Sequence, residues 1–397
     1  MSTPAAPDRA LTRVIILLAL TAFASGASLR ISDPLLPQVA QDFGSTLGAA
    51  SSIVTAYAIP YGMTQVFAGV IGDRLGKCQA VAAACAASCL LVLLCAGAQS
   101  VPQLAFARFV SAPGAAIIVP LGMAYVGDLV PYARCQAVLA RFLAGQMFGM
   151  IAGQVAGGII GDHFGWRAVF VALAGVFALA ALALASQRGN PWTKPTHHES
   201  ARISFVAGYR NLFAAPWARF IILAVLFEAG IFFAGFTYVA ADLHARFGLS
   251  FSAVGLVIAA YGVGCVLYAA SVHRLVEAFG ERGLVIGGGI VVMLAFLTLA
   301  VQPFWQAAPL AVAMLGFGYY MVHNTLQTHA TQMLPEARGT AVAGFSSALY
   351  LGQSIGVALA APIVDRLGAV PLFLLAAVLW AALALWVRIR IGRRESF

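Results

Sequence analysis

The chain is poor in charge. Only 9% of its 397 residues are Asp, Glu, Lys or Arg, whereas 61% are hydrophobic. Soluble domains carry roughly 25% charged residues, and so few charges cannot build a surface that faces water. This composition excludes a soluble enzyme, a nucleic-acid-binding domain and a secreted scaffold. The hydrophobic content is sufficient for about twelve membrane-spanning helices of ~20 residues each.

The sequence also lacks the patterns that hold metals, disulfides or nucleotides. None of the six Cys residues forms a C-x-x-C pair, and four of them fall in one apolar run, 78–95. The glycine runs at 157–158 and 287–289 lie inside apolar segments, not between a strand and a helix. We therefore predict no metal, no cofactor and no enzymatic activity. The energy for any transport must come from an ion gradient or from the gradient of the substrate.

Apolar runs recur along the whole chain and predict twelve membrane-spanning helices. They lie near 13–36, 49–71, 78–98, 102–126, 135–160, 166–186, 217–240, 250–275, 283–301, 305–330, 339–363 and 369–390. A polar segment separates the sixth run from the seventh. We predict an all-α membrane protein with a six-helix bundle at 1–186, a cytoplasmic linker at 187–212 and a second six-helix bundle at 213–397.

Basic residues are distributed unevenly between the predicted loops. If the N-terminus is cytoplasmic, most of the 23 Lys and Arg residues fall on the cytoplasmic side, and only Arg167, Arg246 and Arg366 fall opposite. Lys and Arg are enriched in the cytoplasmic loops of membrane proteins. We therefore predict that both termini are cytoplasmic, and we interpret the first apolar run as an uncleaved span.

The two halves of the chain resemble each other. Residues recur at a shift of 204 and, after one deletion, of 203. The recurring pairs include Gly44 and Gly248, Gly76 and Gly280, Asp162 and Asp365, and Gly165 and Gly368. Repeated bundles in the same orientation are related by an axis normal to the membrane and can rock about a central cavity. The repeat therefore favours a transporter that works by alternating access.

The loop after the second span reads GVIGDRLGK, from Gly69 to Lys77. It resembles the G-x-x-x-D-R-x-G-R/K loop of the major facilitator superfamily. The resemblance implies a conformational latch, in which Asp73 contacts the cytoplasmic start of span 11 near Gly339 and Thr340. Its members would be Gly69, Asp73, Arg74, Gly76 and Lys77, with the two basic side chains supporting the latch or binding lipid headgroups. The alternative is a plain basic loop.

Two further stretches are similar to motifs of the proton-coupled drug exporters in that family. Span 4 carries Arg108 in RFVSAPGAA, where Ser111 and Ala112 replace the Gln-Gly of the family pattern. Span 5 reads GMIAGQVAGG, with Gln154 at the position of the antiporter Pro. The alternatives are that Arg108 reaches the outer interface and that the span 5 glycines only allow close helix packing. Those glycines are Gly149, Gly153, Gly157 and Gly158.

Two acidic residues, Asp33 and Glu228, lie well inside predicted spans. Ionisable residues at membrane depth are functional candidates, and Arg30 shares a helix face with Asp33 at i, i+3. We predict that Glu228 and Asp33 carry protons, with Arg30 and Arg108 as charge partners. Alternatively, Asp33-Pro34 marks an irregular helix end, and Glu228 is a hydrogen-bonded packing residue.

A polar stripe in span 10 is our candidate for substrate binding. Its members at helical spacing are Tyr320, His323, Asn324 and Gln327. Tyr57, Tyr61, Gln154 and Gln353 extend the candidate lining from other spans. The alternative is a polar helix that pairs with span 11.

These features lead to a secondary transporter of the bacterial inner membrane that resembles the twelve-span drug:proton antiporters. We predict proton-coupled efflux of a small organic molecule. One alternative is a proton-coupled permease for an anionic metabolite or siderophore, held by Arg30, Arg108 and His323. Another is a membrane sensor or assembly factor without transport. The expected partners are a small-molecule substrate, protons and membrane lipids but no nucleic acid, and we expect a monomer.

Overall fold

A computed structural model describes residues 9–130, 132–187, 190 and 205–395. Within these ranges the chain forms helices and no β-strand. The first part contains α1 (Arg9–Arg30), η1 (Asp33–Leu35), α2 (Leu36–Asp42), α3 (Leu47–Gln65), α4 (Ala68–Leu75), α5 (Lys77–Ala96), α6 (Val101–Leu129), α7 (Tyr132–Phe164) and α8 (Trp166–Ala185). The predicted linker at 187–212 falls largely outside the described residues.

The second part begins with the short helix α9. Its elements are α9 (Phe205–Ala214), α10 (Pro216–Phe236), α11 (Val239–Phe247), α12 (Phe251–Val301), η3 (Trp305–Ala307), α13 (Ala308–Gln332), η4 (Pro335–Ala337), α14 (Arg338–Leu367) and α15 (Ala369–Glu395). Helices are the expected outcome because apolar surroundings force each backbone N–H and C=O to pair within its own segment.

Nine helices within the described residues are long and apolar enough to cross a membrane. One of them, α12, covers both predicted spans near 250–275 and 283–301. Its backbone leaves the helical conformation between the two spans, at Gly280. The helices α3 and α13 lie over predicted spans but are not among the nine. The chain is therefore a multi-pass membrane protein, and the count of twelve spans stays a prediction.

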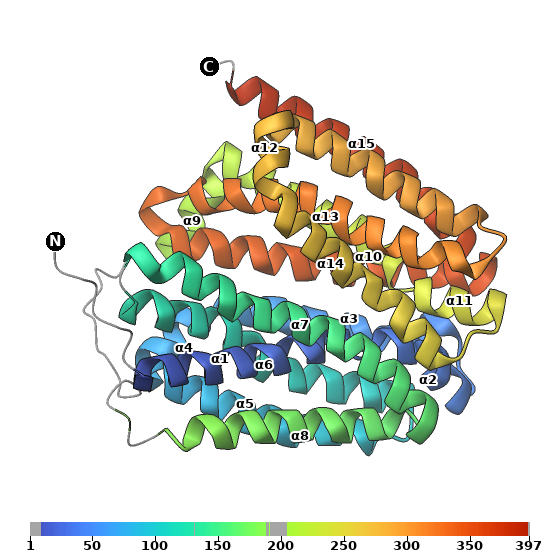
Figure 1. Cartoon of the computed structure of the whole chain (residues 1–397), viewed down its shortest axis with the longest axis horizontal. Coiled ribbons are helices and arrows are strands. Elements are labelled where there is room, and N and C mark those ends of the chain that lie inside the picture. The colour runs from blue at the N-terminus through green and yellow to red at the C-terminus, as the bar shows by residue number, and fades with distance from the viewer. Residues whose placement is uncertain (1–8, 131, 188–189, 191–204, 396–397) are drawn as a thin grey trace.

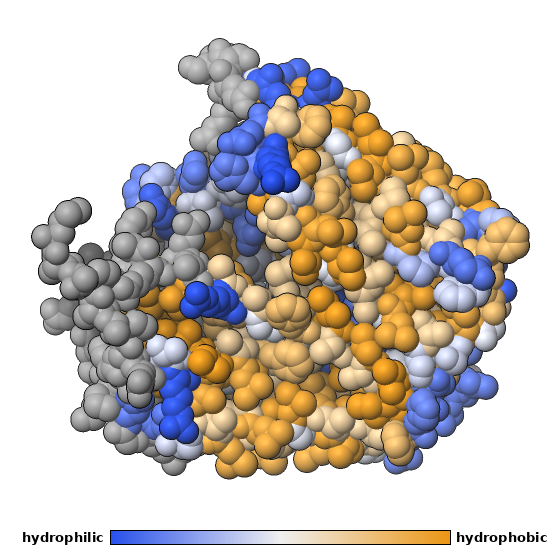
Figure 2. Space-filling model, viewed as in Figure 1, coloured by the Kyte–Doolittle hydropathy of each residue, from blue (hydrophilic) through white to orange (hydrophobic). Residues whose placement is uncertain are grey.

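The surface agrees with a membrane setting. Figure 2 shows apolar residues over the middle of the visible face, with hydrophilic residues gathered toward its two ends. Exposed apolar side chains belong to many helices, among them Leu90, Phe106, Leu182, Leu310 and Leu359. In a soluble monomer, contiguous apolar patches larger than a few hundred Å² are rare. This band is the part of the surface that lipid tails would cover.

Glycines with positive φ reveal the internal repeat in the backbone. Within the described residues all positive-φ positions are glycines, and they form the pairs Gly44 and Gly248, Gly76 and Gly280, and Gly165 and Gly368. These are pairs that the sequence repeat predicts. Only glycine adopts this conformation without steric cost, so both halves use glycine at the same corners.

Buried apolar side chains form two large clusters, one within 14–184 and the other within 212–391. Figure 1 shows α1–α8 in the lower part of the view and α9–α15 in the upper part. Two helices of the first part, α3 and α7, pack on α14 and α12 of the second. We call the end with α2 and α11 the distal end, and the end with both chain termini the proximal end (Figure 1).

The glycines of α7 let neighbouring backbones approach closely. A Cβ on Gly153 would lie 2.7 Å from the carbonyl oxygen of Ala27 in α1, and Gly149 also faces α1, whereas Gly157 lies against Ile31 just after it. Gly158 faces α12 instead, close to Gly255. Small residues are favoured where membrane helices pack tightly, and here they bring α7 against two partners.

Candidate functional site

Arg30 and Asp33 lie at the break between α1 and η1. The helix ends at Arg30, and Pro34 opposes its continuation because it lacks an N–H and restricts the residue before it. Arg30 Nη1 lies 3.6 Å from Asp33 Oδ2, and both side chains are buried. The predicted pair therefore forms across an irregular helix end, so the alternative interpretation of Asp33-Pro34 also describes this place. The side chains of Gln154 in α7 and of Arg108 are close enough to interact electrostatically with the Asp33 carboxylate.

Arg108 is a fully buried cation in α6, with 1% of its surface exposed. Its Nη2 donates to the carbonyl oxygen of Ser28 at 2.9 Å, and its guanidinium lies 3.7 Å from the centre of the Tyr57 ring. Its Nε and Nη1 donate to none of the residues that the structure describes. Arg108 therefore does not reach the outer surface, and it keeps hydrogen-bonding capacity inside the protein.

Glu228 of α10 and His323 of α13 form a second buried pair. Glu228 Oε2 lies 2.9 Å from His323 Nδ1, and Glu228 has no exposed surface. The hydroxyl of Tyr319 lies 3.3 Å from the same nitrogen, and its ring stacks on the imidazole. The sequence placed Glu228 and His323 in separate candidate sets. No local signal could have joined them, because their positions are 95 residues apart in the sequence.

A chain of contacts connects the two charged pairs. The Arg30 guanidinium lies 4.1 Å from the centre of the Phe233 ring in α10. Phe233 in turn lies near Tyr319, with 6.1 Å between the ring centres. An arginine of the first part thus packs on the same helix that carries Glu228.

The candidate substrate-binding residues differ in their exposure. Tyr57, Tyr61, Gln154 and Gln353 are buried. The Tyr61 ring lies 4.6 Å from that of Tyr350 in α14, across the two parts of the chain. On α13 the exposure differs from residue to residue. His323 is buried, Tyr320 and Asn324 are partly buried, and Gln327 is exposed. Asn324 donates to the hydroxyl of Tyr268.

The predicted latch is only partly described. The structure does not describe the side chains of Asp73 and Arg74. Of Gly69 it describes only the helical backbone. Lys77 pairs with Asp128 of α6, a partner that the sequence reasoning missed. Near the expected landing point, Thr340 lies against Gly208 of α9.

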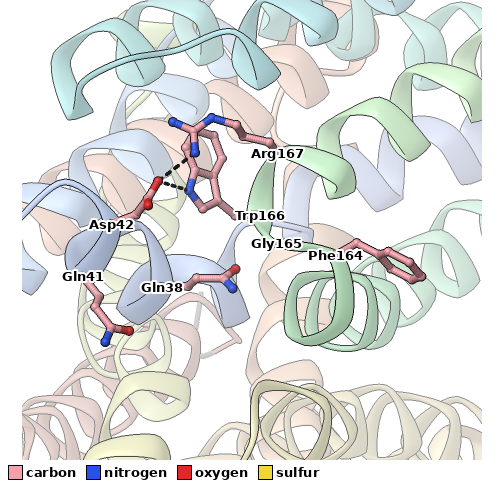
Figure 3. Close-up of a pocket in the computed structure, with 7 residues that line it drawn as sticks. All are labelled: Gln38, Gln41, Asp42, Phe164, Gly165, Trp166 and Arg167. Carbon is pink, nitrogen blue, oxygen red and sulfur yellow. Dashed lines mark hydrogen bonds and ion pairs between the residues drawn. The ribbon is translucent and has the colours of Figure 1, made fainter.

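Two surface cavities lie away from the candidate substrate-binding residues. One, of about 340 Å³, is at the distal end, where Asp42 accepts hydrogen bonds from Trp166 (2.9 Å) and Arg167 (2.7 Å; Figure 3). The other, of about 660 Å³, is at the proximal end between α13 and the start of α14. Among the described residues, no three His, Cys, Asp or Glu side chains cluster as metal ligands would.

Comparisons with known proteins identify the family. The model of the Major Facilitator Superfamily matches residues 18–357 and 223–396. The MFS-type transporter YceJ of Bacillus subtilis is 26% identical over 339 residues, covering 85% of this chain and 86% of that protein. The probable transporter SCO4007 of Streptomyces coelicolor is 28% identical over 396 residues, covering 91% and 86%.

A solved structure has the same fold. The nucleoside transporter NupG superposes with a TM-score of 0.78 at 13% identity, covering 95% of this chain and 99% of that one. Together with the many apolar helices, these matches confirm the superfamily that the loop after the second span resembles. The chain belongs to the major facilitator superfamily and is a multi-pass membrane transporter.

Proposed function

We propose that this protein exports a small organic molecule across the bacterial inner membrane in exchange for protons. In this proposal twelve spans form two six-helix bundles, 1–186 and 213–397, joined by the cytoplasmic linker 187–212. The bundles rock about the central helices, so that the binding site faces one side of the membrane at a time. Both termini are cytoplasmic.

The observation that carries the proposal is the buried pair of Glu228 and His323. A lone carboxylate at membrane depth is costly, so it is paired or neutralised. Histidine changes its charge near physiological pH. The pair can therefore hold one proton as an ion pair and a second as a neutral carboxyl beside an imidazolium. That second proton weakens the attraction between α10 and α13, which links proton binding to helix movement.

Asp33 provides a second place for a proton. When it is ionised, its charge balances that of Arg30, and Arg108 lies nearby. When it is protonated, the two guanidinium groups lose their shared counter-charge. Because Arg30 also packs on Phe233 of α10, this change would alter a contact between the two bundles.

The test needs a transported compound. Compounds that bind the native state raise its apparent stability, so thermal unfolding of the purified protein against a library supplies candidates. Transport of each one is then measured in proteoliposomes with an imposed pH gradient. Glu228→Gln is expected to abolish gradient-driven transport and to spare binding.

Glu277→Gln is the matched control. Glu277 also faces a histidine, with 3.3 Å between His273 Nδ1 and its Oε1, but this pair is exposed on α12. We expect wild-type transport from that variant. Equal transport by Glu228→Gln and the wild type would remove Glu228 from the mechanism and leave proton exchange at this pair without support.

A second candidate function is proton-coupled uptake of an anion. The free Nε and Nη1 of Arg108 favour it, because a buried guanidinium with unused donors suits a carboxylate or phosphate. The direction of transport under an imposed pH gradient separates the two functions. Stabilising compounds that are uniformly anionic, and accumulate in the direction of the proton flow, would favour uptake over export.

A further inference from the structure

Asp162, near the end of α7, contacts the start of a helix in the other part of the chain. Its Oδ2 accepts hydrogen bonds from the hydroxyl of Ser252 at 2.7 Å and from the backbone N–H of Ser252 at 3.3 Å. Ser252 is the second residue of α12. The first backbone N–H groups of a helix have no partner within the helix, so this carboxylate supplies one from the opposite half.

Asp365, near the end of α14, makes the same contact in the reverse direction. Its Oδ1 accepts a hydrogen bond from the backbone N–H of Gly48 at 2.7 Å. Gly48 is the second residue of α3. A Cβ at this position would lie only 2.5 Å from the other carboxylate oxygen, so the absence of a side chain gives the carboxylate room.

The two contacts are related by the internal repeat. The shift of 203 places Asp162 on Asp365, and the shift of 204 places Gly48 on Ser252. The helix caps repeat as well, because Thr46 and Ser250 each accept a hydrogen bond from the third residue of their own helix. Each helix start thus receives one partner from its own cap and one from an aspartate across the interface.

Other contacts hold the same end of the molecule together. A Cβ on Gly255 of α12 would lie 2.8 Å from the carbonyl oxygen of Gln154, so the backbones of α7 and α12 touch. The hydroxyl of Tyr238, which precedes α11, donates to Ser51 of α3 at 2.8 Å. The distal end is therefore closed, with both aspartates at its rim.

We propose that Asp162 and Asp365 form two latches, related by the internal repeat, that hold the distal end of the transporter closed. The inference rests on the alternating access of the proposed function, in which this end must open once per cycle. Both carboxylates are exposed, so water and salt weaken each contact. The two latches act together, and either one alone biases the equilibrium only modestly.

The distance between two spin labels, measured by electron paramagnetic resonance, tests the proposed latches directly. Labels at Gln99, in an exposed loop of the first half, and at Gln306, exposed in η3 of the second, report the width of the distal end. Cys89 and Cys135, the cysteines that are not buried, are replaced by Ser. We expect a short distance in the parent protein. Asp162→Ala and Asp365→Ala are each expected to lower the ratio of closed to open molecules about threefold, and the double variant about tenfold.

Asp42→Ala is the matched control. Asp42 is also an exposed distal carboxylate, but its partners Trp166 and Arg167 belong to its own half. Its removal is expected to leave the distance distribution unchanged. If the double variant fails to fold, Gly48→Ala displaces the carboxylate of Asp365 and should open the distal end as the single Asp365 variant does.

The outcomes for the latches and for the proposed function are distinguishable. Distances in the double variant, or in Gly48→Ala, that match the parent protein would overturn the latches even if transport is proton-driven. Opening in the double variant with no proton-driven transport by the wild type would retain the latches and overturn the exporter. A control variant that opens as far as the double variant would also overturn the specific pair.

Discussion

Glu228 Oε2 lies 2.9 Å from His323 Nδ1, which makes one buried acid–base pair out of helices α10 and α13. The carboxylate has no exposed surface, and its second oxygen bonds to none of the described residues. Such a pair is weak evidence for stability by itself, yet removing one partner is expensive because the other charge is left buried. It therefore offers tests in which stability and transport are measured separately.

His323→Ala should lower the free energy of unfolding by about 3 kcal/mol at neutral pH, since Glu228 would stay buried without a counter-charge. The loss should shrink as the pH falls, because a protonated Glu228 carries no charge. Unfolding of the detergent-solubilised protein over a series of pH values measures this. His273→Ala, at the exposed pair with Glu277, serves as the control and should change little. A loss that is independent of pH would mean that His323 acts only by packing.

Arg108→Lys should reduce transport by tenfold or more, because an ammonium cannot both stack on Tyr57 and reach the carbonyl of Ser28. The interaction between Arg108 and Tyr57 should appear as a coupling energy of about 1–2 kcal/mol in a double-mutant cycle with Tyr57→Leu, read from unfolding. Arg393→Lys, at an exposed arginine of α15, should behave like the wild type. Additive effects of the two site variants would show that the ring does not hold the guanidinium.

Gly153→Ala should destabilise the protein by about 1–3 kcal/mol, because the added methyl group meets the backbone of Ala27. Gly175→Ala in α8 is the natural comparison, since a Cβ there has no neighbour within 4 Å. That variant should be neutral or slightly more stable, as alanine favours helices over glycine. The melting temperatures of the two variants give the answer, and equal values would contradict the close packing of α1 on α7.

Gly280→Ala should cost about 1–2 kcal/mol, because its φ of 61° is unfavourable for a residue with a Cβ. Gly97→Ala, at a glycine with φ of −84°, should cost less. A comparison of thermal unfolding in the same detergent checks the difference. A tolerated alanine at 280 would indicate that α12 can run straight through this position.

The positions of the helices and of the glycine corners around the site could largely be predicted from the sequence. The apolar runs located the helices, and the repeat located the glycine corners, because both signals depend on local conformation. The nearness of Arg30 and Asp33 could also be predicted, since residues three apart meet on a helix or at its end. Even there the sequence left open whether the helix continues, and the structure shows that it breaks at Arg30.

The sequence by itself determined that this chain is a helical membrane protein with two similar halves, because composition and periodicity decide what the lipid allows. Only the tertiary structure decided which polar groups meet. Glu228 contacts His323, Arg108 contacts Tyr57, and Asp162 contacts Ser252, all from different helices. The physical reason is that a buried charge takes whichever partner the helix packing brings near, and packing depends on the shapes of whole surfaces, which no single stretch of sequence contains.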